Sequence, residues 1–135
     1  MSDQPQPHQY SEHELAVIEG VFDLARGGRT SELLEMLDSG FPLDLANARG
    51  DTLLIVAAYA EQPGTVGALI ERGAAIDAEN AMGQTALSCA AFRGNAEMAR
   101  ALLDAGADPE AGHQPALAIA RQFGRAELET LLLER

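Results

Sequence analysis

The chain has 135 residues, which suits a single domain. Its 21 acidic residues outnumber its 9 basic residues, all of them arginine, and give a formal charge of −12. This charge disfavours nucleic acid and anionic membrane surfaces as partners, because both are bound through clustered cations. The composition is 47% apolar but only 4% aromatic, without tryptophan, so alanine and leucine must form most of the core.

Residues 1–10 are polar and contain prolines, so we expect a disordered arm. Ser11 forms a capping-box pattern with Glu14, and an apolar stripe follows at helical spacing: Leu15, Ile18, Phe22 and Ala25. The first helix should end at Gly27 and Gly28. Thr30 or Ser31 is expected to cap a second helix. We interpret residues 11–46 as an N-terminal unit whose acidic first helix covers one end of the fold.

Residues 47–79 form a second predicted unit of two short helices. Thr52 is placed to cap its first helix. The second helix, over residues 62–70, should be the softest ordered helix, because Gly64 and Gly67 each cost roughly 1 kcal/mol relative to alanine in a helix interior.

Residues 80–112 form the third unit. Leu87, Ala90 and Ala91 make an apolar stripe in a helix that Gly94 ends, and the next helix carries Met98, Ala101 and Leu102. Residues 113–135 form a C-terminal unit with a connection three residues shorter than the one before it, and charged side chains cover its end.

These units repeat with a period of 33 residues, seen in Gly40, Gly73 and Gly106 and again in Gly50 and Gly83. The segments GDTLLIVAA and GQTALSCAA resemble the Gly-x-Thr-Pro-Leu-His-x-Ala-Ala motif of ankyrin repeats. The resemblance covers about residues 20–135 and implies an all-α solenoid of about four helix-turn-helix units joined by short finger turns. The motif histidine is replaced by Ile55, Ser88 and Ala118, so its turn-bracing hydrogen bonds must be absent or replaced.

The resemblance also implies a function, because ankyrin repeats are as a class protein-binding modules without catalysis. Their partners contact the finger tips and the concave face of the first helices. Transferred by position, the expected partner-binding residues are Arg49, Asp51, Tyr59, Met82, Gln84, Phe92, Arg93, Gln122 and Phe123. Three of these are aromatic and recur at equivalent or adjacent positions, which is typical of an interface, although the rings could instead fill gaps between fingers and helices.

The sequence shows no sign of catalytic or cofactor chemistry. The histidines are far apart, Cys89 is a single cysteine within an apolar stripe, and phosphate-binding or nucleophile motifs are missing. Asp44, Asp77 and Asp108 recur near the unit exits, where we expect them to hydrogen-bond turn backbone. We therefore predict a non-enzymatic protein without metal or cofactor.

The cellular location is predicted from segments that the chain lacks, and the assembly state is predicted from the charge at its ends. Its apolar runs are shorter than the ~18 residues of a membrane span, and its start is unlike a signal peptide, so we expect a cytoplasmic protein. Charge at both ends favours a monomer that binds another protein. Two alternatives are assembly by self-association and an acidic, immunity-type inhibitor that masks a basic site, which would need acids in the groove.

Overall fold

The computed structural model describes residues 10–134, and within that range the fold is all-helical, as predicted. The predicted arm therefore lies outside the described residues, except for Tyr10. The helices form four consecutive antiparallel pairs, and each pair falls within one of the proposed units. They are α1 (Glu12–Arg26), α2 (Thr30–Asp38), α3 (Leu53–Tyr59), α4 (Pro63–Glu71), α5 (Ala86–Arg93), α6 (Ala96–Asp104), α7 (Ala116–Gln122) and α8 (Ala126–Leu133).

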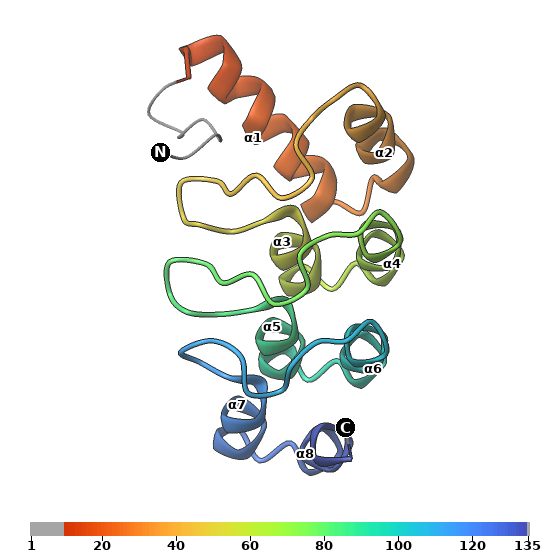
Figure 1. Cartoon of the computed structure of the whole chain (residues 1–135), viewed down its shortest axis with the longest axis vertical. Helices are drawn as coiled ribbons and strands as arrows, with labels where there is room; N and C mark the ends of the chain where they lie inside the picture. Colours follow the sequence, from red (N-terminus) through yellow and green to blue (C-terminus); the bar gives the residue numbers. More distant parts are fainter. Residues whose placement is uncertain (1–9, 135) are drawn as a thin grey trace.

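The helices stack in two columns, and the connections between pairs project to one side as fingers (Figure 1). The odd-numbered helices form the inner column next to the fingers, and the even-numbered helices form the outer column. Each helix packs on the equivalent helix of the next pair, as α3 does on α5 and α5 on α7. The fold is therefore a short solenoid in which contacts run mainly between neighbours.

Alanine pairs in the inner column explain how helices of seven or eight residues stack so closely. Ala57 and Ala58 in α3, and Ala90 and Ala91 in α5, are all fully buried. Their small side chains let the backbones approach, while larger residues such as Leu87 and Leu102 fill the space between the two columns. Packing thus supplies the stability that such short helices lack on their own.

Most of the predicted helix ends are confirmed. Ser11 and Glu14 form the capping box, with reciprocal hydrogen bonds of 3.1 and 3.0 Å. The bond from the Ser11 backbone N–H is the main cause that lowers the pKa of Glu14. The side chain of Thr52 caps α3, and Gly94 ends α5 in the left-handed conformation.

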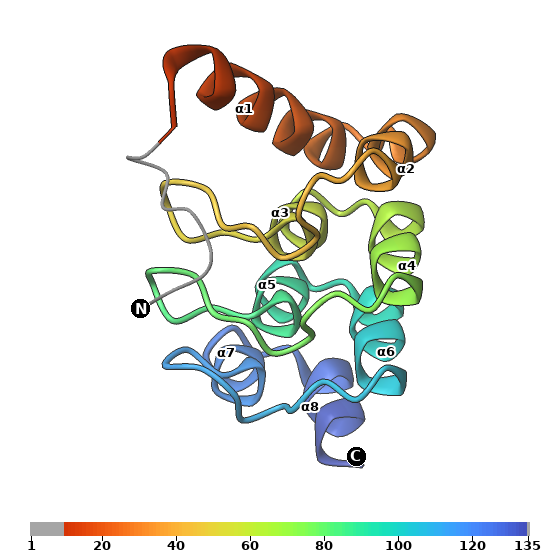
Figure 2. The same cartoon turned by 45° about the horizontal axis from the view of Figure 1, so that its top comes forward.

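Three details of the predicted stripes and caps are wrong. Helix α2 begins at Thr30, so neither Thr30 nor Ser31 caps it, and no side chain forms a cap there. The Thr30 hydroxyl instead lies 2.7 Å from that of Thr65 in the next pair. Ala101 faces solvent on α6, where Ala99 is buried instead. Leu15 is 37% exposed, because the first half of α1 extends beyond the stack and has no helix below it (Figure 2).

The fingers run over residues 39–52, 72–85 and 105–115, so the last is three residues shorter than the others. They are joined by the recurring aspartates: Asp44 accepts a hydrogen bond from the N–H of Ala75, and Asp77 accepts one from Asp108. The predicted turn bonds are therefore present, and these two link successive units. None of the helices formed by residues 10–134 has both the length and the hydropathy needed to cross a membrane.

Candidate partner-binding groove

A groove of about 770 Å³ lies between the fingers and helices α3 and α5. Its floor is apolar and comes from the inner helices, whereas its outer wall comes from the finger tips. Seven of the nine residues predicted to bind a partner line it. The full lining is Arg26, Arg49, Asp51, Ile55, Val56, Tyr59, Ala60, Asn80, Ala81, Met82, Gln84, Cys89, Phe92 and Arg93.

The aromatic side chains form a continuous exposed row along the inner column. The rings of Tyr59 and Phe92 are stacked, with centroids 6.1 Å apart, and Phe92 meets Phe123 edge to face at 5.4 Å. Each ring remains between 38% and 47% exposed. Phe123 is therefore a surface residue, although it and the exposed Gln122 lie on the next unit and do not line the groove.

Arg93 is held in place over the Tyr59 ring. Its guanidinium carbon lies 5.2 Å from the ring centroid, and its Nη2 and Nε donate to Glu61 Oε2 at 2.8 and 3.1 Å. The hydrogen bonds to Glu61 are the largest cause that raises the pKa of Arg93, so the guanidinium stays charged. This contact fixes the Tyr59 side chain and reduces the ordering entropy that binding would cost.

Glu61 is a functional candidate that the sequence prediction missed. Among residues 10–134 it is the one non-glycine residue with a positive φ, at 56°, and it stands at the turn where the following unit has Gly94. The left-handed conformation costs a residue with a Cβ about 1–2 kcal/mol. The missing glycine at this one turn was visible in the sequence and could have drawn attention to it.

Asn47 and Asn80, which lie 33 residues apart, shape the finger tips and were also missed. The side-chain oxygen of Asn80 accepts hydrogen bonds from the backbone N–H groups of Met82 and Gln84, both at 2.9 Å, and Asn47 does the same in the previous finger. The repeated segments NARGDT and NAMGQT carried this signal. The two asparagines fix the tip backbone that presents Met82.

The fingers also bond to each other, which keeps the groove wall continuous. The Asn80 side-chain NH₂ donates to Asp51 at 2.9 Å, so the Asp51 carboxylate joins the two fingers of the wall. Gly50 and Gly83 have positive φ values, and a Cβ at either would lie 2.7 Å or less from the next finger. Glycine is therefore required where the fingers meet.

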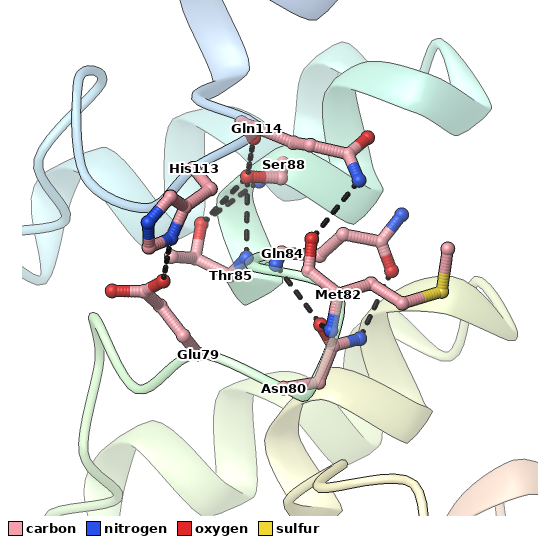
Figure 3. A network of polar contacts seen from close by, with 8 residues as sticks. All are labelled: Glu79, Asn80, Met82, Gln84, Thr85, Ser88, His113 and Gln114. Atoms are coloured by element: carbon pink, nitrogen blue, oxygen red, sulfur yellow. Dashed lines mark hydrogen bonds and ion pairs between the residues drawn. The ribbon is translucent and has the colours of Figure 1, made fainter.

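Ser88 takes over the bracing role expected of the motif histidine in the third unit (Figure 3). Its hydroxyl donates to the Gln114 carbonyl at 2.6 Å and accepts from the Thr85 N–H at 3.2 Å. The Gln114 side chain in turn donates to the Met82 carbonyl at 3.0 Å. This network connects α5 and the last finger to the tip that carries Met82, and His113 adds a 3.3 Å contact to Glu79.

The charges along the groove differ in sign from the chain as a whole. Three arginines and one aspartate line it, whereas the chain carries −12. Arg26 pairs with Asp23 outside the groove, and Arg93 pairs with Glu61. Within residues 10–134, no carboxylate forms an ion pair with the exposed guanidinium of Arg49. Within that range, Arg49 is therefore the one cation of the groove lining without a carboxylate partner, whereas the carboxylate of Asp51 accepts a hydrogen bond from the Asn80 amide.

Reactive and metal-binding groups do not gather in the described part of the chain. Cys89 lies under the groove floor and is only 2% exposed; burial raises the pKa of its thiol to about 12, so it remains neutral. No group of three or more His, Cys, Asp or Glu side chains among residues 10–134 is arranged to hold a metal ion.

Two comparisons relate this geometry to known proteins. The family described as ankyrin repeats (3 copies) matches residues 22–113 and again residues 54–135. A Pseudomonas aeruginosa protein named as an ankyrin repeat protein is 39% identical over 66 residues, which make up 49% of this chain. The matched region spans 38% of that relative's own length.

Proposed function

Because the chain belongs to the ankyrin repeat family, whose members are generally protein–protein interaction modules and typically lack catalysis, we propose that it binds another protein through the groove between the fingers and α3 and α5. The observation that carries this proposal is the exposed aromatic row of Tyr59, Phe92 and Phe123. Exposed aromatics beside arginine are the composition of interface hot spots.

The mechanism is rigid presentation. Met82 is 65% exposed on a tip whose backbone Asn80 holds, and Tyr59 is fixed by Arg93. A partner that enters the groove would cover these side chains without first having to order them, so little of its binding free energy is lost to conformational entropy. The other predicted partner-binding residues complete this surface: Arg49, Asp51 and Gln84 lie on the fingers, and Gln122 and Phe123 extend the row at the end of α7.

The proposal is tested by capture of partners from the native lysate with the wild type and the Tyr59→Ala/Phe92→Ala double variant, both shown to be folded by circular dichroism. We expect a partner that the wild type retains and the double variant loses. The matched control is Leu15→Ala/Val17→Ala, which removes two exposed apolar side chains from α1, away from the groove. A partner lost with the control and retained by the groove variant would contradict the proposal.

We further propose that the chain is a monomer. The helices at the two ends carry acidic side chains such as Glu12 and Glu19 on α1 and Glu127 on α8, so stacked copies would bring like charges together. The inhibitor alternative is disfavoured because the lining of the groove contains three arginines and only one aspartate, already bonded to Asn80. Light scattering over a range of concentrations tests the monomer, and a mass that doubles would support self-association.

A further inference from the structure

We propose that the segment recognised in the groove is acidic as well as apolar: a peptide segment in which a large apolar or aromatic side chain lies near a carboxylate. This inference rests on the proposed function, because it specifies the chemistry of the partner at the same groove. It follows from which side chains of the groove are already satisfied and which are left open to a partner.

Every charged group of the lining except one has a partner within the chain. Asp51 accepts a hydrogen bond from Asn80 at 2.9 Å, Arg93 is paired with Glu61 at 2.8 Å, and Arg26 is paired with Asp23. The guanidinium of Arg49 has no such partner among residues 10–134. A carboxylate from a bound segment is the group that matches the planar donors of an arginine at this place.

The apolar part of the proposed segment follows from the floor. Ile55 and Val56 of α3 line it together with the stacked rings of Tyr59 and Phe92, and Met82 stands above it on the finger tip. A ring or a long aliphatic chain can enter between the Met82 thioether and the stacked rings, where contact with sulfur and aromatic faces is favourable. A lysine or arginine entering there would meet the unpaired guanidinium of Arg49, so a basic segment is disfavoured despite the chain's charge of −12.

Selection from a library of random linear peptides displayed on phage, with the folded full chain as bait, tests the inference directly. We expect enriched peptides to combine aspartate or glutamate with an aromatic or large aliphatic residue. A labelled synthetic copy of the best peptide and its amide counterpart, with the acid replaced by asparagine or glutamine, then allow a double-mutant cycle with Arg49→Ala. The carboxylate peptide should bind Arg49→Ala roughly fivefold more weakly than wild type, whereas the amide peptide should bind both about equally.

Arg100→Ala is the matched control, because Arg100 is an exposed arginine on α6, in the outer column away from the groove. Arg100→Ala changes the net charge by the same amount as Arg49→Ala and should leave the affinity for both peptides unchanged. The comparison therefore separates a local contact from long-range attraction. Enriched peptides without acids, or equal loss of both peptides with Arg49→Ala, would overturn this inference while the proposed function stands. Selected peptides that bind Tyr59→Ala/Phe92→Ala as tightly as wild type, or a library without enrichment, would count against both.

Discussion

The second and third units, residues 47–79 and 80–112, share one template but stabilise it differently. In the third unit, Thr85 and Ser88 form a capping box, Gly94 makes the left-handed turn and the Asn95 side chain caps α6. In the second unit, Ile55 replaces Ser88, Glu61 stands at the left-handed turn, and Gln62 makes no side-chain cap for α4. At these positions the third unit forms hydrogen bonds at its turns, whereas the second unit has a buried branched side chain, Ile55, and lacks the cap of its second helix.

This difference shows that a repeat in the middle of a solenoid can lose local signals when its neighbours supply packing. Helix α3 is buried from Leu53 to Ala58, and it packs against both α1 and α5. The groove lies where the two units meet, and the residue that departs most from the template, Glu61, holds Arg93 there. Relaxed local rules and the candidate site therefore coincide.

The largest expected effect concerns the feature that both units share, the buried alanine pair. Ala90→Asp should lower the free energy of unfolding by about 3–5 kcal/mol, because it places an unpaired charge between α5 and its neighbours. Ala57→Asp should do the same in the second unit. Urea denaturation followed by circular dichroism measures both, with the exposed Ala101→Asp as control. Cooperative unfolding of Ala90→Asp at the wild-type midpoint would contradict the assigned packing.

Cys89 is a titratable position that only the third unit has, because the equivalent residue of the second unit is Val56. The pH dependence of the free energy of unfolding tests its role. The thiol has a pKa of about 12 in the folded chain but an ordinary value near 8.5 when unfolded. Its contribution is therefore fully present below pH 8.5 and is lost as the pH rises toward 12. Between pH 8 and 10 the wild type should lose about 2 kcal/mol more stability than Cys89→Ala. Parallel pH curves for the two proteins in urea denaturation would show that the thiol is not held neutral.

Ser88→Ala tests the hydrogen-bonded network of the third unit. The substitution removes the bonds to the Gln114 carbonyl and the Thr85 N–H in a fully buried site, and it should cost about 1–2 kcal/mol of unfolding free energy. Ser31→Ala, at an exposed position of α2, is the control and should be neutral. Stability equal to wild type for Ser88→Ala would mean that the second unit's apolar solution serves equally well at this position.

The contrast between the units also explains which features the sequence could predict. Thr52 and Gly94 act through bonds within a few residues, so local patterns predicted their roles. The link between Thr30 and Thr65, 35 residues apart, depends on how α2 packs on α4, so no local pattern predicted it.

The candidate groove was predictable to a similar extent. The resemblance to ankyrin repeats placed Tyr59, Phe92 and Met82 on one surface, and the structure brings them together around the groove. The missing glycine at residue 61 was visible in the sequence, but the contact of Glu61 with Arg93, 32 residues away, depends on how the two units pack and has no local signature. The pairing state of Arg49 likewise depends on where distant carboxylates end up.

Glu61→Gly should bring the second unit closer to the third. It relieves the left-handed strain but loses an exposed ion pair with Arg93, so we expect a net gain of roughly 0.5–1 kcal/mol in unfolding free energy. The opposite change, Gly94→Ala, should lower the free energy of unfolding. Residue 94 has a positive φ, and a Cβ there would lie 2.8 Å from the Arg125 guanidinium. Thermal denaturation measures both variants. A loss of stability with Glu61→Gly would mean that the ion pair outweighs the strain.

The smallest effect is expected in α4, which sequence reasoning predicts to be the softest ordered helix. Gly67→Ala should raise the free energy of unfolding by about 0.5–1 kcal/mol, because a Cβ there meets nothing within 4 Å and the unfolded chain loses flexibility. Gly73→Ala is the matched control: it has equal space, but a φ of +86° makes it strained, so it should destabilise. Hydrogen exchange should show α4 amides exchanging faster than α6 amides in wild type and more slowly after Gly67→Ala. Equal protection of α4 and α6 in the wild type would mean that packing from the neighbouring units fully compensates for the glycines, so that the two units differ in their local bonds but not in their local stability.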